Sequence, residues 1–165
     1  PAPKQVDWST HIAALWQPHP LGGRLVPVPP RDGLMLDDLL GIERQKLALV
    51  DNTQALLQGF PANHALLWGS RGSGKSSLMR ALLNSLSAEG LRMIQVDRHD
   101  LASLPRLVEE LRGVPDYEDL VIVLYSDMEA EKLQQYCINN DINGYFCKSM
   151  DITQITDFLD NFYEI

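Results

Sequence analysis

The chain has 165 residues, of which 45% are hydrophobic and 22% charged, and its net charge is −8. This length suits one compact domain, and because no run of about eighteen apolar residues occurs, we expect no membrane span. An acidic chain lacks the basic face that a nucleic-acid backbone requires, so nucleic acid is not an expected partner. With two cysteines (Cys137 and Cys147) in no metal-binding spacing and no signal-like start, we expect reduced thiols and a cytoplasmic location.

The charge is unevenly distributed along the chain. Residues 1–117 hold 12 basic and 12 acidic residues, whereas residues 118–165 hold 2 basic and 10 acidic ones. All nine arginines precede Tyr117, and all five tyrosines lie at or after it. This break predicts either a functional acidic face or a junction between two sequences of different origin.

The first 32 residues are rich in proline and show no clear hydrophobic period. We expect Trp8 and Trp16 to anchor this arm onto the body of the domain. Residues 24–28 predict a short edge strand, a position in which proline is tolerated.

From residue 39 onward, helical and strand patterns alternate. Predicted helices cover residues 39–57, 76–86, 104–111, 128–138 and 152–162, and predicted strands cover residues 65–68, 92–96, 120–124 and 144–147. This alternation predicts a three-layer α/β fold, with a parallel sheet that has helices on both faces. Ligands of such sheets bind at the carboxyl ends of the strands.

One motif in this pattern carries chemistry, the run Gly69-Ser70-Arg71-Gly72-Ser73-Gly74-Lys75-Ser76. It matches the Walker A P-loop, whose glycines let backbone N–H groups turn toward an anion. It follows an apolar strand and opens an amphipathic helix, whose N-terminus adds positive potential. We therefore predict that residues Gly69 to Ser77 bind the phosphates of ATP or ADP. Lys75 would reach the outer phosphates, and Ser76 would hold Mg²⁺.

Binding alone does not imply hydrolysis. A P-loop ATPase needs an acidic group on a neighbouring strand to hold magnesium, and a second acid to orient the attacking water. Asp127, after the strand at 120–124, is the nearby candidate, but it could equally be the N-cap of the next helix. Both interpretations stay open, and we expect little or no hydrolysis, with residual ATPase activity at most.

Several segments around the P-loop share the pattern of a known family. They are Asp38-Leu39-Leu40-Gly41-Ile42-Glu43-Arg44-Gln45-Lys46, Asn52-Thr53, Pro61-Ala62-Asn63-His64-Ala65-Leu66-Leu67-Trp68-Gly69, Lys75-Ser76-Ser77-Leu78 and Val96-Asp97-Arg98. Together they resemble a poorly characterised family of bacterial AAA+-type P-loop ATPases, over residues 8 to 115. That family would continue into a Walker B strand with paired aspartates, an arginine sensor and a helical lid. None of these follows here, so the resemblance implies phosphate binding more than ATPase activity or ring assembly.

A different pattern appears in the last third of the chain. Ser126 ends a predicted strand, Lys148 follows 22 positions later, and Gly144-Tyr145 precedes that lysine. This spacing resembles the C-terminal part of a response-regulator receiver domain, in which the hydroxyl and the lysine contact a phosphoryl group on an aspartate. Asp97 could occupy the place of that aspartate. However, the P-loop stands where receivers carry acidic residues, and Ser149 stands where proline usually follows the lysine, which favours Ser126 and Lys148 as solvated strand ends.

The charge break and the change of resemblance coincide near residues 115–119. We therefore interpret residues 1–165 as one domain and as a deliberate chimera, a P-loop NTPase-like and flavodoxin-like hybrid. Residues 1–115 would be the P-loop part, and residues 116–165 the receiver part. Numbered from the P-loop strand, the strands would lie in the order 2-3-4-1, and any N-terminal strand would extend the sheet beyond the P-loop strand.

These observations predict an engineered, monomeric domain that binds nucleotide phosphates. One alternative is a folding or design scaffold whose loop holds only sulfate or phosphate. Another is a signalling domain regulated by phosphorylation at Asp97.

Overall fold

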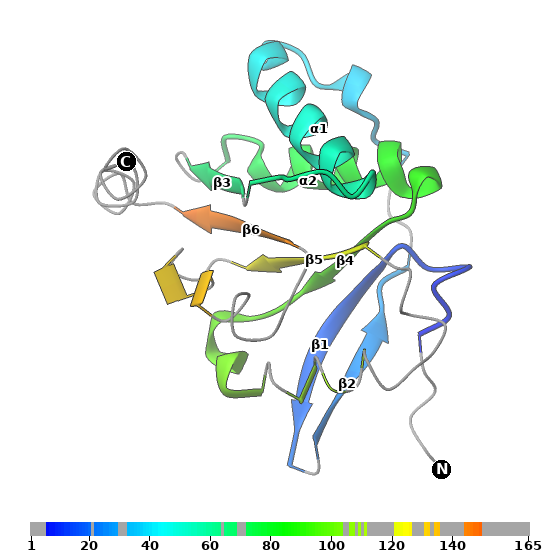
Figure 1. Cartoon of the computed structure of the whole chain (residues 1–165), viewed down its shortest axis with the longest axis vertical. Coiled ribbons are helices and arrows are strands. Elements are labelled where there is room, and N and C mark those ends of the chain that lie inside the picture. The colour runs from blue at the N-terminus through cyan, green and yellow to red at the C-terminus, as the bar shows by residue number, and fades with distance from the viewer. Residues whose placement is uncertain are drawn as a thin grey trace.

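A computed structural model of the chain describes residues 6–20, 22–29, 33–63, 65–68, 72–103, 106–107, 109, 111, 121–126, 131–132, 134–135 and 144–149. Its centre is a six-stranded sheet in the order β2-β1-β4-β5-β6-β3 (Figure 1). The strands are β1 (Ala13–His19), β2 (Gly22–Pro27), β3 (Ala65–Trp68), β4 (Leu91–Gln95), β5 (Val121–Ser126) and β6 (Gly144–Ser149). Only the β1–β2 pair is antiparallel among these described strands.

The order of the four strands from β4 to β3 confirms the predicted order 2-3-4-1. β4, β5, β6 and β3 follow one another across the sheet, so the last strand lies between β5 and the P-loop strand. The expected position of an N-terminal strand was wrong. β1 pairs with β4 at the opposite side of the sheet from β3, with Ala13 opposite Met93 and Leu15 opposite Gln95.

On that side of the sheet, β1 forms an antiparallel hairpin with β2. Ala14 and Trp16 of β1 are buried and alternate with half-buried residues, which is the period of a strand with one face on the core. Beyond β4, the hairpin continues with β2 as the predicted edge strand, and Pro27 lies opposite Ala14. A Cβ built on Gly23 would overlap with the Trp16 indole, so the absence of a side chain in β2 makes room for this ring.

The N-terminal arm is anchored as predicted, because Trp8 and Trp16 are only 5% and 2% exposed. Arg92 Nε donates to the Trp8 carbonyl at 3.0 Å, which fastens the arm to the start of β4. Nearby, the N–H and the hydroxyl of Ser9 donate to the Asp7 carboxylate and lower the pKa of Asp7. This contact therefore stabilises the fold above the ordinary Asp pKa and is lost as the pH falls through the lowered value.

Two long helices, α1 (Glu43–Leu57) and α2 (Lys75–Leu86), lie on the same side of the sheet (Figure 1). α1 begins four residues later than predicted and ends as predicted at Leu57. Gly59, with φ of +75°, follows its end, and the N–H of Phe60 donates to the Ala55 carbonyl at 2.9 Å. These are the features of a Schellman C-cap, in which glycine takes the left-handed conformation.

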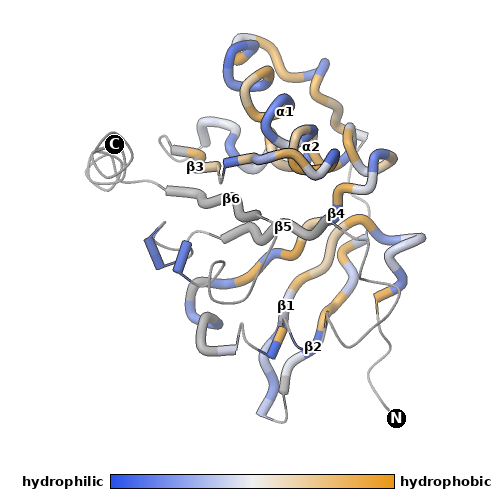
Figure 2. Tube along the Cα trace, viewed as in Figure 1, coloured by the Kyte–Doolittle hydropathy of each residue, from blue (hydrophilic) through white to orange (hydrophobic). Residues whose placement is uncertain are grey.

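The main core lies between α1, α2 and β4. Figure 2 shows hydrophobic segments along β4 and along parts of both helices. The buried residues of this cluster are Leu49, Leu78, Met79, Leu82, Leu83, Leu86, Leu91 and Met93. Because five of these eight residues belong to α2, the P-loop helix contributes more to this core than any other element.

The predicted helical layer on the other face of the sheet stays a prediction. The segments expected to form it, 104–111, 128–138 and 152–162, lie partly or wholly outside the described residues. Residues 106–107 and 131–132 within them are helical. Among the described helices, none has both the length and the apolar character needed to cross a bilayer.

Candidate functional site

The described part of the predicted phosphate loop has the backbone of an anion-binding nest. Gly72 and Gly74 both adopt the left-handed conformation, with φ of +84° and +87°. A Cβ on either glycine would meet open space, so backbone conformation and not crowding demands glycine here. Alternation of left-handed residues turns successive N–H groups toward one side, which is how P-loops surround a phosphate.

The helix that follows supplies the charge. Lys75 is the first residue of α2 and only 8% exposed, and its Nζ donates to the Ser73 hydroxyl at 3.1 Å. The Leu78 N–H donates to the Gly74 carbonyl at 2.8 Å, so regular helix bonding starts at the loop. The N–H groups before it belong to the positive end of the helix dipole. Ser76 is exposed on this first turn, and Ser77 is half-buried.

The sheet carries this loop to the edge where ligands of parallel sheets bind. β3 runs into the loop and pairs with β6, with Trp68 opposite Ser149. The carboxyl ends of β4, β5, β6 and β3 therefore all face the same edge of the sheet. At the start of β3, the Asn52 side chain donates to the Asn63 carbonyl at 2.6 Å and accepts from the Asn63 N–H at 2.8 Å. The Asn52 amide thus pairs with both main-chain groups of Asn63, as a neighbouring strand would, and links α1 to the segment before β3.

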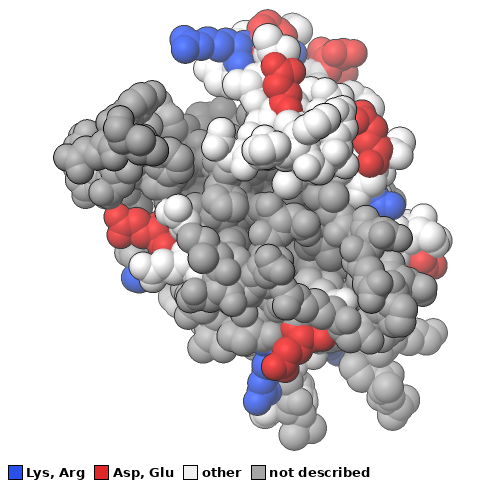
Figure 3. Space-filling view, in the orientation of Figure 1, with Lys and Arg blue, Asp and Glu red and all other residues white. Residues whose placement is uncertain are grey.

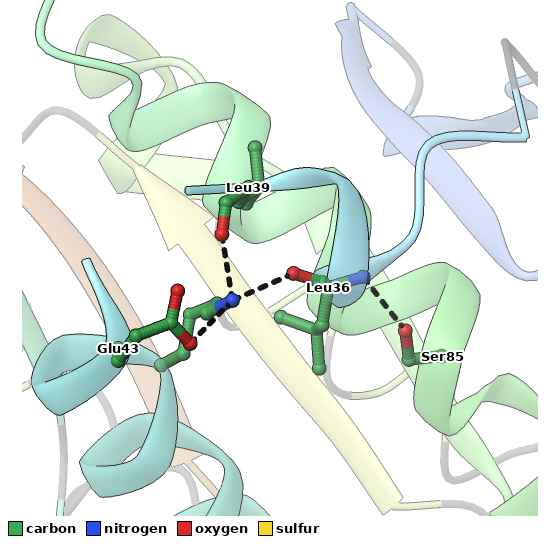
Figure 4. Close-up of polar contacts among 5 residues, drawn as sticks. Leu36, Leu39, Glu43 and Ser85 are labelled. Carbon is green, nitrogen blue, oxygen red and sulfur yellow. Dashed lines mark hydrogen bonds and ion pairs between the residues drawn. The ribbon is translucent and has the colours of Figure 1, made fainter. Parts of the chain in front are cut away.

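A segment at residues 34–39, which we call the strap, fastens α1 to α2. It contains a single turn of 3-10 helix, η1 (Leu36–Asp38). On the α2 side, Asn84 Nδ2 donates to the Leu34 carbonyl at 2.9 Å, and the Leu36 N–H donates to the Ser85 hydroxyl at 3.3 Å. On the α1 side, Lys46 donates hydrogen bonds to the carbonyls of Leu36 and Leu39, which are labelled in Figure 4.

Lys46 makes three polar contacts with its ammonium group. Its Nζ donates to the carbonyls of Leu36 and Leu39 at 3.0 and 2.6 Å and lies 2.7 Å from the Glu43 carboxylate (Figure 4). The Lys46 side chain is 11% exposed, whereas that of Glu43 is 69% exposed. The two part-buried hydrogen bonds to carbonyls therefore contribute more to stability than the ion pair with the exposed Glu43.

We expect Lys46→Met to lower the free energy of unfolding by about 1–3 kcal/mol, because two carbonyls lose a charged donor while the apolar stem is kept. Urea unfolding monitored by circular dichroism would measure the change. Arg44→Met is the matched control, since Arg44 is an exposed basic residue on the same helix. Equal unfolding midpoints for the two variants would contradict the strap as a stabilising link.

The structure describes some of the other predicted site residues. Others lie outside the part of the chain that it describes. Gly69, Ser70, Arg71 and Asp127 are among the latter, so their roles stay predictions. Asp97 follows β4, and its carboxylate accepts a hydrogen bond from the His99 N–H at 2.9 Å. It thereby caps the 3-10 helix η3 (Arg98–Ser103), which is a structural role for the carboxylate that the receiver resemblance had connected with phosphorylation.

The backbone of the receiver-like pair can also be placed. Ser126, at the end of β5, lies opposite Cys147 of β6, and Lys148 lies opposite Leu67 of the P-loop strand. The sequence analysis did not predict the strap with Lys46 or the paired hydrogen bonds between Asn52 and Asn63. Their partners are main-chain carbonyls and N–H groups, which no side-chain pattern reveals.

Two further observations concern the basic side chains and the potential metal ligands of the described residues. Lys and Arg side chains lie apart from one another on the face shown in Figure 3. Within the described part of the chain, no three His, Cys, Asp or Glu side chains come together as a candidate metal-binding group.

Two solved structures show where this fold belongs. A RuvB mutant of Thermotoga maritima matches with a TM-score of 0.51 and 20% identity, over 80% of this chain and 46% of that one. A katanin structure, whose title concerns katanin self-assembly, matches with a TM-score of 0.50 and 18% identity, over 81% of this chain and 52% of that one. The chain therefore shares its fold with part of these two proteins and spans about half the length of each.

Sequence comparison leads to a family. No curated protein matches the chain. The family described as "Protein of unknown function (DUF815)" matches residues 9–136, which is most of the sequence, and the chain belongs to this family.

Proposed function

We propose that this chain binds ATP or ADP together with Mg²⁺ through its phosphate loop, and turns the nucleotide over slowly or not at all. The observation that carries the proposal is the pair of left-handed glycines, Gly72 and Gly74, directly before a buried lysine at the start of a well-packed helix. Backbone N–H groups, a helix N-terminus and an ammonium group converge there, and each favours an anion.

The residues present also suit the metal that accompanies a nucleotide. Ser76 offers an exposed hydroxyl on the first turn of α2, one residue after Lys75. Hydroxyl and carboxylate oxygens are the ligands that Mg²⁺ prefers, and the ion keeps several waters when bound through few protein groups. We assign Ser76 as its protein ligand, with Asp127 after β5 as the second. When bound, the ion would neutralise charge on the phosphate oxygens.

We infer limited turnover because neither sequence neighbour of Asp127 is acidic. Asp127 is the candidate for the magnesium side, and Met128, its neighbour, cannot serve as a base. P-loop enzymes need a residue that orients the attacking water in addition to the metal-binding acid. The likeness to RuvB and katanin supports nucleotide binding, and it concerns about half the length of those proteins.

The origin of the last third of the chain stays a prediction. The charge break and the spacing of Ser126 and Lys148 support a receiver-derived part. The family match continues to residue 136, past the predicted junction at residues 115–119, which speaks against a change of family before that point. Phosphate binding by the loop does not depend on where the C-terminal part comes from.

The test is a calorimetric titration of Mg-ATP into the parent protein and into Lys75→Ala. Loss of one charged phosphate contact should weaken binding by about tenfold to a hundredfold, or roughly 1.5–3 kcal/mol. Arg44→Ala is the matched control, because it removes one exposed positive charge from α1 and should leave the affinity within about twofold.

The same titration decides between the proposal and the scaffold alternative. A loop that only holds sulfate or phosphate would bind inorganic phosphate as tightly as Mg-ATP, without dependence on magnesium. No heat of binding from the folded parent protein at millimolar Mg-ATP would contradict the proposed function.

A further inference from the structure

Ser73 occupies a particular place in the phosphate loop. It stands between the two left-handed glycines, and its hydroxyl accepts the hydrogen bond from Lys75 Nζ at 3.1 Å. Residues 72–74 are exposed, whereas Lys75 keeps only 8% of its exposable surface. The lysine stem is therefore packed at the start of α2, while its ammonium group reaches back to a hydroxyl on the exposed loop. This direction agrees with the tilt of helical side chains toward the N-terminus of their helix.

The bond to Ser73 is expected to orient the Lys75 ammonium for a bound phosphate and not to compete with that phosphate for it. An ammonium group has three donors, so it is able to bond a hydroxyl and an anion at the same time. A long lysine side chain loses rotamer entropy when a ligand fixes it. A neighbour that already holds the ammonium beside the loop reduces this loss at the moment of binding, which is the general benefit of preorganisation.

We propose that Ser73 is a positioning residue of the phosphate site, whose hydroxyl holds the Lys75 ammonium beside the nest so that it meets a bound phosphate. This inference rests on the proposed function. The Walker A pattern fixes the glycines and the lysine of the loop. The inference adds that the residue two positions before the lysine must carry a hydroxyl. Threonine should therefore replace Ser73, and alanine should not.

Calorimetric titration of Mg-ATP and of magnesium tripolyphosphate tests the role of Ser73. Ser73→Ala should weaken both ligands by about two- to tenfold, the equivalent of one hydrogen bond, and Ser73→Thr should stay within about twofold of the parent. In a Lys75→Ala background, adding Ser73→Ala should change nothing, because Ser73 acts through the lysine. A loss of the same size in both backgrounds, or no loss in the parent background, would overturn the proposal.

A second measurement separates failure of this inference from failure of the proposed function. Acetic anhydride acetylates free amines, and mass spectrometry gives the rate at Lys75 with Lys46 as the internal reference. We expect Lys75 to react several-fold faster in Ser73→Ala and at the parental rate in Ser73→Thr. If Lys75 reacts in this way but the protein binds neither ligand, the proposed function is contradicted, whereas the Ser73–Lys75 contact is supported. Equal rates in all three proteins would overturn the contact whatever the binding result.

Discussion

Gly74→Ala should weaken Mg-ATP binding by about tenfold or more, and lower the free energy of unfolding by about 1–2 kcal/mol. Gly74 precedes Lys75 with φ of +87°, a conformation that a residue with a Cβ adopts only under strain. Relief of this strain would rotate the N–H groups of the nest away from the anion, and the lysine that follows would move with them. Calorimetric titration and urea unfolding measure the two effects.

Gly59→Ala is the matched control for this prediction. Gly59 has φ of +75° at the end of α1, and a Cβ there would also meet open space. The backbone strain should therefore cost a similar free energy of unfolding, while nucleotide affinity stays at the parental value. If both variants lost affinity equally, the loop geometry would not be what binds the nucleotide.

Trp16→Ala should lower the free energy of unfolding by about 3–5 kcal/mol, the range for truncation of a large buried aromatic side chain. The Trp16 ring is 2% exposed and lies against Gly23 of β2, and its Nε1 donates to the Ser103 hydroxyl at 2.6 Å. The ring thus joins the N-terminal hairpin to η3, at the end of β4. Chemical denaturation followed by circular dichroism gives the change.

One further variant separates the contribution of hydrogen bonding from that of ring packing, and a second serves as a control. Ser103→Ala removes the acceptor of the indole N–H and also the hydrogen bond from the Ser103 hydroxyl to the Asp100 carbonyl, so it should cost about 1–3 kcal/mol. Gly33→Ala is the neutral control, since a Cβ at this exposed glycine meets nothing within 4 Å. Trp16→Ala with no greater effect than Ser103→Ala would show that the ring is not part of the core.

The centre of the site was predictable because its signals are local. The strand at 65–68 was predicted with its observed bounds, and the P-loop helix with an error of one residue at its start. An apolar run, a glycine-rich loop and an amphipathic segment follow one another there without interruption, so each signal limits the next. The order of the four strands from β4 to β3 was predicted from the strand layouts of the two families that the sequence resembles.

The N-terminal region was harder because long-range contacts decide it. β1 offers only two fully buried side chains, Ala14 and Trp16, and contains Pro18, so its alternation is weak in the sequence. Its place beside β4 follows from pairing with residues 93–95, far along the chain. The strap is held through main-chain carbonyls by Lys46 and Asn84, and backbone acceptors are present in every sequence.

The position of the P-loop strand at the end of the sheet has a consequence for biosynthesis. Within the described sheet, β3 has β6 as its neighbour, and the registered pairs join residues 65–68 to residues 146–149. During synthesis the nucleotide loop leaves the ribosome long before the strand that supports it, and such distant pairing must first overcome the entropy of closing a long loop. The proposed nucleotide affinity would therefore appear late in synthesis, after β6 has paired with β3.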